Sequence, residues 1–142
     1  AEIIRHQLLK VGIIVKIKSM EWQAFLNTVV HPKEFEAIIL GWSLSITPDA
    51  YSIWHSNSIT KGGFNLISYK NKKVDQLIIN SQSMINKKEL KQAYQEIFKE
   101  IVSDNPYIFL YIPDSITAIN KNIRNVKPSI IGLKHNLIRW EK

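Results

Sequence analysis

Aromatic, hydroxyl and amide side chains gather between residues 41 and 69 of this 142-residue chain. The group begins with Gly41-Trp42-Ser43, directly after the apolar run Ala37-Ile38-Ile39-Leu40. Its further members are Ser45, Tyr51, Trp54, Asn57, Asn65 and Tyr69. Flat rings beside a few hydroxyl and amide groups are typical of a pocket for an uncharged or amide-rich ligand. Buried tryptophan is also common in protein cores, so a core position for Trp42 remains the alternative.

The sequence offers no positive support for catalysis or for a metal site. It has no cysteine, and its four histidines include no pair at the helical spacing that metal ligands use. It has no G-x-S-x-G motif, and Gly62-Gly63 fits neither phosphate-binding glycine pattern. Ser43 and Ser45 lie near Asp49 and His55 in sequence, which is too weak a pattern to indicate a catalytic triad. We therefore predict no enzyme, no metal and no cofactor, and the enzyme alternative requires His55 within hydrogen-bond reach of either serine.

A net charge of +7 would suit a protein that binds nucleic acid or an anionic membrane surface. The lysines are scattered along the chain, and three arginines are few for a surface that reads bases. We therefore expect a lysine-rich surface and no nucleic acid, and keep a nucleic-acid-binding domain as a remote alternative. No apolar run approaches the length of a membrane span. Since the chain opens without Met and directly in a helical pattern, we expect it to be a fragment.

Alternating secondary structure is predicted for the first forty residues. Helical spacing of apolar residues predicts helices over 4–11 and 22–29, the first ending at Gly12 and the second at His31-Pro32. β-branched or apolar runs predict strands over 13–18 and 36–40. These elements read as a βαβ unit with parallel strands. Ligands of such sheets bind beyond the carboxyl ends of the strands, where the loop 41–49 would lie.

Helices dominate the middle of the chain and strands are expected toward its end. A short helix should carry Tyr51 and Trp54, and two longer helices should begin at the N-caps Asn71 and Asn86. The sequence Asp104-Asn105-Pro106 should stop the second of them. The segments expected to form strands after this point are 107–112 and 115–120, while 130–132 and 137–140 are expected to be brief strands or extended packing.

Several short motifs follow one another along the chain: Leu8-Leu9-Lys10-Val11-Gly12-Ile13, Glu21-Trp22, Phe35-Glu36-Ala37, Gly41-Trp42, Pro48-Asp49, Tyr51-Ser52-Ile53-Trp54-His55-Ser56, Gly63-Phe64-Asn65, Tyr69-Lys70-Asn71, Val74-Asp75-Gln76-Leu77-Ile78 and Asn105-Pro106-Tyr107. In this order they resemble the C-terminal part of the family 5 extracellular solute-binding proteins. They cover nearly the whole chain in order. Each motif is weak alone, and the ordered set is specific.

The resemblance implies an α/β fold, namely the C-terminal lobe of a two-lobed periplasmic-binding-protein-like (type II) fold, with a mixed sheet flanked by helices. Residues 1–125 would belong to the ligand-binding lobe, and residues 126–142 would form a tail returning toward the other lobe. The whole protein would be an exported receptor, periplasmic or on the cell surface as a lipoprotein, and monomeric. It would touch the membrane only through a lipid anchor on the missing N-terminus. It would close on a peptide or small solute and deliver it to the membrane permease of an ABC importer.

The family pattern also implies ligand contacts for Trp42, Ser43, Ser45, Asn65 and Tyr69. In peptide-binding members, an acidic residue three places after the Gly-Trp tryptophan neutralises the amino group of the ligand. The matching residue here is Ser45, which cannot pair with a buried ammonium group. Asp49 could replace it, although its position also suits a helix start. Peptide remains the default ligand, with a blocked peptide, a sugar or chelated nickel as alternatives.

Overall fold

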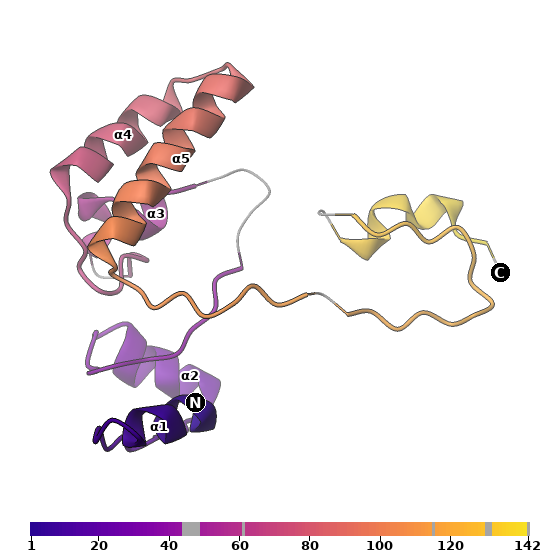
Figure 1. Cartoon of the computed structure of the whole chain (residues 1–142). Helices are drawn as coiled ribbons and strands as arrows, with labels where there is room; N and C mark the ends of the chain where they lie inside the picture. The colour runs from indigo at the N-terminus through magenta and orange to yellow at the C-terminus, as the bar shows by residue number, and fades with distance from the viewer. Residues whose placement is uncertain (44–48, 61, 115, 130–131, 142) are drawn as a thin grey trace. The chain divides into compact units, whose positions relative to one another are not determined.

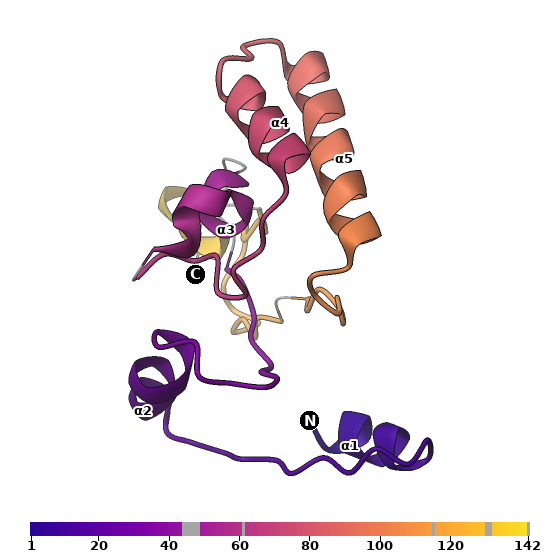
Figure 2. The same cartoon turned by 90° about the vertical axis from the view of Figure 1, so that its left-hand side faces the viewer.

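The longest helices, α4 (Lys72–Gln82) and α5 (Lys87–Asp104), form an antiparallel hairpin in the computed structural model (Figures 1 and 2). The structure describes residues 1–43, 49–60, 62–114, 116–129 and 132–141. These residues divide into two compact units, one made of residues 1–43 and 49–106 and the other of the described residues from 107 onward. The predicted boundary near residue 125 stays a prediction.

Side-chain caps start both helices of the hairpin where the sequence predicts. Asn71 Oδ1 accepts hydrogen bonds from the backbone N–H groups of Lys73 and Val74, at 2.9 and 3.2 Å. Asn86 Oδ1 accepts from the backbone N–H of Lys88 at 2.9 Å. These bonds satisfy donors that the first helical turn leaves without partners. Asn105 ends α5 in the left-handed conformation, with φ of 49°.

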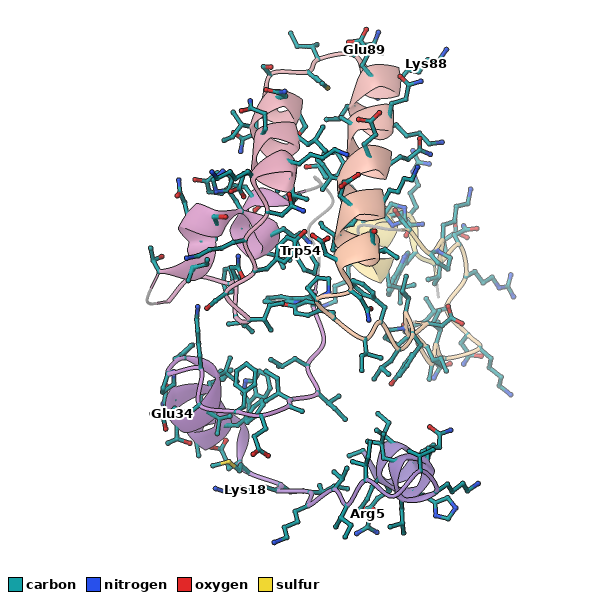
Figure 3. The ribbon with its side chains drawn as sticks, turned by 60° about the vertical axis from the view of Figure 1, so that its left-hand side comes forward. Arg5, Lys18, Glu34, Trp54, Lys88 and Glu89 are labelled. Carbon is teal, nitrogen blue, oxygen red and sulfur yellow. The ribbon has the colours of Figure 1, made fainter. Side chains whose placement is uncertain are left out.

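Apolar side chains of the two helices form the core of the first unit. The buried residues on facing sides of the hairpin are Val74, Ile78, Ala93, Ile97 and Ile101. The short helix α3 (Tyr51–Trp54) packs against α4 and adds two more buried side chains, Ile53 and Trp54. Figure 3 labels Trp54 where α3 lies close to the hairpin. Through Trp54 this core contacts Tyr69, one of the residues of the predicted site.

The remaining helices are short. They are α1 (Glu2–Leu9), α2 (Trp22–Phe25), the π-helical turn η1 (Leu26–Val30) and the 3₁₀ helices η2 (Ser56–Ile59) and η3 (Leu133–Arg139). Helices near the predicted positions 4–11 and 22–29 are therefore confirmed, and Gly12 follows the first with φ of 81°. No helix among the described residues is long and apolar enough to cross a bilayer.

The predicted sheet is absent from the part of the chain that the structure describes. The segments 13–18, 36–40, 107–112 and 116–120 are not strands, while Ser115, Ile130 and Ile131 lie outside the described residues. The pattern identified apolar segments correctly, but a strand also requires a neighbour to complete its backbone hydrogen bonds. Here the apolar side chains stay open to solvent, with Ile112 96% exposed. The loop after Gly41 therefore has no described sheet edge beneath it.

An isolated antiparallel bridge between Arg124 and Glu141 joins two described parts of the second unit. Arg124 N donates to Glu141 O at 2.8 Å, and Glu141 N donates to Arg124 O at 3.3 Å. Asn136 connects the same region, since its Nδ2 donates to Asn125 O at 2.8 Å and its Oδ1 accepts from Trp140 Nε1 at 3.0 Å. The brief strand or extended packing predicted over 137–140 is wrong, because most of that segment belongs to η3.

Candidate ligand-binding site

Two partly exposed aromatic rings meet at the start of the candidate site. Trp42 and Phe64 pack edge to face, with ring centroids 5.9 Å apart and an angle of 84° between the ring planes. Trp42 is 38% exposed and Phe64 is 55% exposed. Trp42 is therefore no core residue in this structure, since a core tryptophan would be shielded from water. The pair presents apolar surface to solvent, as a ligand wall would.

Phe64 is a residue that the sequence analysis did not single out. It stands within the Gly63-Phe64-Asn65 motif, of which only Asn65 was predicted to contact a ligand. The feature of the sequence that could have pointed to Phe64 is the glycine before it, Gly63, and the structure shows why a glycine is needed there. A Cβ on Gly63 would stand 2.1 Å from the backbone oxygen of Ser58, so only glycine fits there without backbone movement. The backbone is thus folded tightly on itself just before Phe64.

Asn65 holds that fold from within. Its side chain is completely buried. Nδ2 donates to His55 O at 3.2 Å and Tyr69 O at 2.9 Å, and Oδ1 accepts from Tyr69 N at 2.9 Å. The amide therefore has partners on both of its polar atoms and ties residue 55 to residue 69. Its predicted contact with a ligand stays a proposal.

Tyr69 joins the loop to the end of the hairpin. Its ring meets Trp54 edge to face at 5.9 Å, and its hydroxyl donates to Asp104 Oδ2 at 2.5 Å. Asn71 Nδ2 donates to the same carboxylate oxygen at 2.7 Å. These hydrogen bonds, the one from Tyr69 first, lower the pKa of Asp104, while burial and then the bond to Asp104 raise the pKa of Tyr69. The position of Tyr69 as a ligand contact is likewise a proposal.

The two predicted serine contacts differ in what the structure describes. Ser43 is exposed beside Trp42, whereas Ser45 lies outside the described residues. Asp49, the possible substitute for a charge at position 45, caps α3. Its Oδ1 accepts from Tyr51 N at 3.0 Å and from Ser52 N at 3.3 Å. Those bonds match the helix-start role that the sequence suggests for Asp49.

The contacts described for His55 hold the local fold and do not form a nucleophile–base pair. Its ring is buried and stacks on Tyr51 with 4.2 Å between the centroids. Nδ1 accepts from Asn57 N at 3.0 Å and lies 3.9 Å from Asp75 Oδ1. The bonds described for His55 do not include Ser43, the one candidate nucleophile that the structure describes. The described residues also contain no cluster of acidic or histidine side chains that could hold a metal ion.

Comparison with known proteins gives two relatives by sequence. The chain is 36% identical over 141 residues to the oligopeptide-binding protein AppA of Bacillus subtilis (strain 168), which covers 99% of the chain and 26% of AppA. It is 27% identical over 122 residues to the probable D,D-dipeptide-binding periplasmic protein DdpA of Escherichia coli (strain K12), covering 84% of the chain and 23% of DdpA. The chain thus spans about a quarter of the length of these relatives. No family model matches it.

The same relationship appears in three dimensions. The structure of AppA from Bacillus subtilis in complex with a nonapeptide superposes with a TM-score of 0.84 at 36% identity, covering 98% of this chain and 28% of that one. Both relatives are named as binding proteins, in agreement with the prediction that the chain is not an enzyme. The chain is therefore homologous to about a quarter of a family 5 solute-binding protein, the family that its ordered motifs resemble.

Proposed function

We propose that this chain is part of an extracytoplasmic receptor that captures a peptide between two lobes and delivers it to an ABC importer. The observation that carries the proposal is the match to AppA, which extends over 99% of the chain. The structure of AppA that this chain resembles contains a bound nonapeptide. The exposed Trp42–Phe64 pair supports it, because partly open aromatic rings suit the side chains of a peptide. The export of the whole protein and its partnership with a permease belong to the same proposal.

The extended apolar segments have a natural role within this proposal. Residues 13–18, 36–40 and 107–112 are rich in apolar side chains that the described chain leaves exposed. About three quarters of each relative lies outside the matched region. In a complete receptor, strands from that remainder would complete the hydrogen bonds of these segments and bury their side chains, giving the mixed sheet of the C-terminal lobe.

The proposed roles in binding differ among the five predicted residues. Trp42 would form a wall of the cleft, while Ser43 and Ser45 would offer hydroxyl and backbone groups to the ligand. Asn65 and Tyr69 would act by shaping the loop, since Asn65 is completely buried and the hydroxyl of Tyr69 is bonded to Asp104. All five predicted residues thus serve one site, by contact or by support.

Calorimetry on the complete protein that contains this chain tests the proposal. The probes are nonapeptides, and Trp42→Ala should weaken their binding about tenfold or more, equivalent to about 1.4 kcal/mol. Trp22→Ala is the matched control, because Trp22 is also exposed and also packs on a phenylalanine, Phe25, at 6.0 Å. No binding of any nonapeptide would reject the proposed peptide receptor. Unchanged affinity in Trp42→Ala would remove Trp42 from the site.

A second measurement asks whether the receptor recognises the charged amino terminus of a peptide ligand. Ser45 carries no charge, and Asp49 Oδ1 already caps α3. We therefore expect free and N-acetylated forms of one nonapeptide to bind with affinities within a few-fold of each other. A loss of a hundredfold or more on acetylation would instead indicate a carboxylate at the amine, as in the peptide-binding pattern of the family.

A further inference from the structure

Lys33 occupies a backbone position where glycine is usual. The helical segment before it ends with Lys33 N donating to Val30 O at 3.1 Å and Glu34 N donating to Val29 O at 2.9 Å. This pair of bonds is the Schellman arrangement, which places Lys33 at the left-handed position with φ of 62°. A side chain at that position has a steric cost that glycine avoids. A strained lysine persists where other contacts favour it, so its side chain merits inspection.

The ammonium group of Lys33 is surrounded by neutral oxygens of a distant loop. Nζ donates to Ile59 O at 3.0 Å, Asn65 O at 2.9 Å and Ser68 Oγ at 3.4 Å. The three donors of an ammonium group match these three acceptors. No salt bridge found among the described residues includes Lys33. The ammonium group therefore binds main-chain carbonyls that lie 26 and 32 residues further along the chain.

The two carbonyls that Lys33 holds lie on either side of Phe64. In the same segment, Gly63 N donates to Thr60 O at 2.8 Å and Asn65 N donates to Ser58 O at 3.3 Å. Fixing both carbonyls to one ammonium group limits how far the intervening backbone can open. Phe64 is more than half exposed, so packing alone holds its ring weakly against Trp42.

We propose that Lys33 is a positioning residue, which holds Ile59, Asn65 and Ser68 so that Phe64 stands against Trp42, and that Phe64 contacts an apolar side chain of the ligand. The ligand part rests on the proposed peptide-binding function; the loop part does not. A purely structural role for Lys33 makes a different prediction, because it would change stability without changing which peptide side chains are preferred.

Hydrogen exchange on the complete protein that contains this chain tests the loop part. Lys33→Gly removes the ammonium group and relieves the backbone cost at the same time. We expect the amides of Gly63 and Asn65 to exchange at least tenfold faster, while those in the middle of α4 and α5 change less than twofold. Lys16→Met, which removes an exposed lysine, is the control for lost charge and should change neither. Unchanged exchange at Gly63 and Asn65 would overturn the proposal.

A double-mutant cycle tests the ligand part. The probes are alanine nonapeptides with a single leucine moved through the nine positions, each compared with the all-alanine peptide. Phe64→Ala should lower the preference for leucine at one position at least fivefold, and Lys33→Gly should lower it at the same position. If Lys33 acts through Phe64, the double variant loses no more than Phe64→Ala alone. Additive losses, or an unchanged leucine preference in Lys33→Gly, would overturn the positioning role.

The two measurements separate this inference from the proposed function. If the wild-type protein binds no nonapeptide, the peptide receptor and the ligand contact of Phe64 are both rejected. The exchange result then still decides whether Lys33 holds the loop.

Discussion

Replacing Asn65 by alanine is the most informative single change, because it removes the buried side-chain amide that joins residue 55 to residue 69. The Asn65 side chain is 0% exposed and makes three hydrogen bonds, two to Tyr69 and one to His55. At about 1 kcal/mol for each bond, the loss is about 3 kcal/mol of unfolding free energy. The buried partners left without a bond would add to this loss unless water reaches them.

Urea unfolding of the complete protein that contains this chain measures the effect, followed by the fluorescence of its tryptophans. Asn57→Ala is the matched control, since Asn57 is an exposed asparagine in the same segment and its backbone bond to His55 survives the change. The control should stay within about 0.5 kcal/mol of wild type. If Asn65→Ala also stays within that range, the hydrogen-bonded arrangement around residue 65 does not hold the loop, and the reasoning fails.

Three further predictions follow from neighbouring residues. Gly63→Ala should destabilise the protein by about 1–3 kcal/mol in the same assay, because its Cβ would stand 2.1 Å from Ser58 O; an unchanged midpoint would contradict the close approach. Tyr69→Phe should lower stability at neutral pH and less at acid pH. Because the pKa of Asp104 is lowered in the folded protein, its ionised carboxylate stabilises the fold above the usual carboxyl pKa of 3.8, and this contribution is lost as the pH falls through the lowered pKa. A loss of stability in Tyr69→Phe that does not depend on pH would refute the Tyr69–Asp104 bond. Asp49→Asn should keep the cap and the affinity for nonapeptides, whereas Asp49→Ala should cost about 1 kcal/mol of stability; a large loss of affinity in Asp49→Asn would instead give Asp49 a role at the ligand.

Local signals in the sequence were sufficient for the helices of the first unit. Asn71 and Asn86 start α4 and α5 as predicted, because an N-cap acts on backbone groups only two or three residues away. Asn105 ends α5 for a similar local reason. The strands were not predicted correctly for the described residues. Their apolar pattern reports a need for burial, whereas a sheet also needs a partner strand that the pattern does not identify.

The candidate site illustrates the same division. Trp42 was identified from its place after an apolar run, and the structure leaves it partly exposed beside Phe64. Phe64 itself was missed, because its closeness to Trp42 joins residues 22 positions apart. Lys33 was missed for the same reason, since its partners lie 26 to 35 residues away.

The sequence by itself determined the family, the starts of α4 and α5 and the end of α5, because these depend on ordered motifs and on interactions within one helical turn. Only the tertiary structure decided that Asn65 is a buried connector, that Tyr69 is bonded to Asp104 and that Lys33 holds the carbonyls around Phe64. Each of these roles depends on which distant backbone atom comes within about 3 Å of a polar side chain. That distance is set by the packing of the whole unit, and the type of residue alone does not contain it.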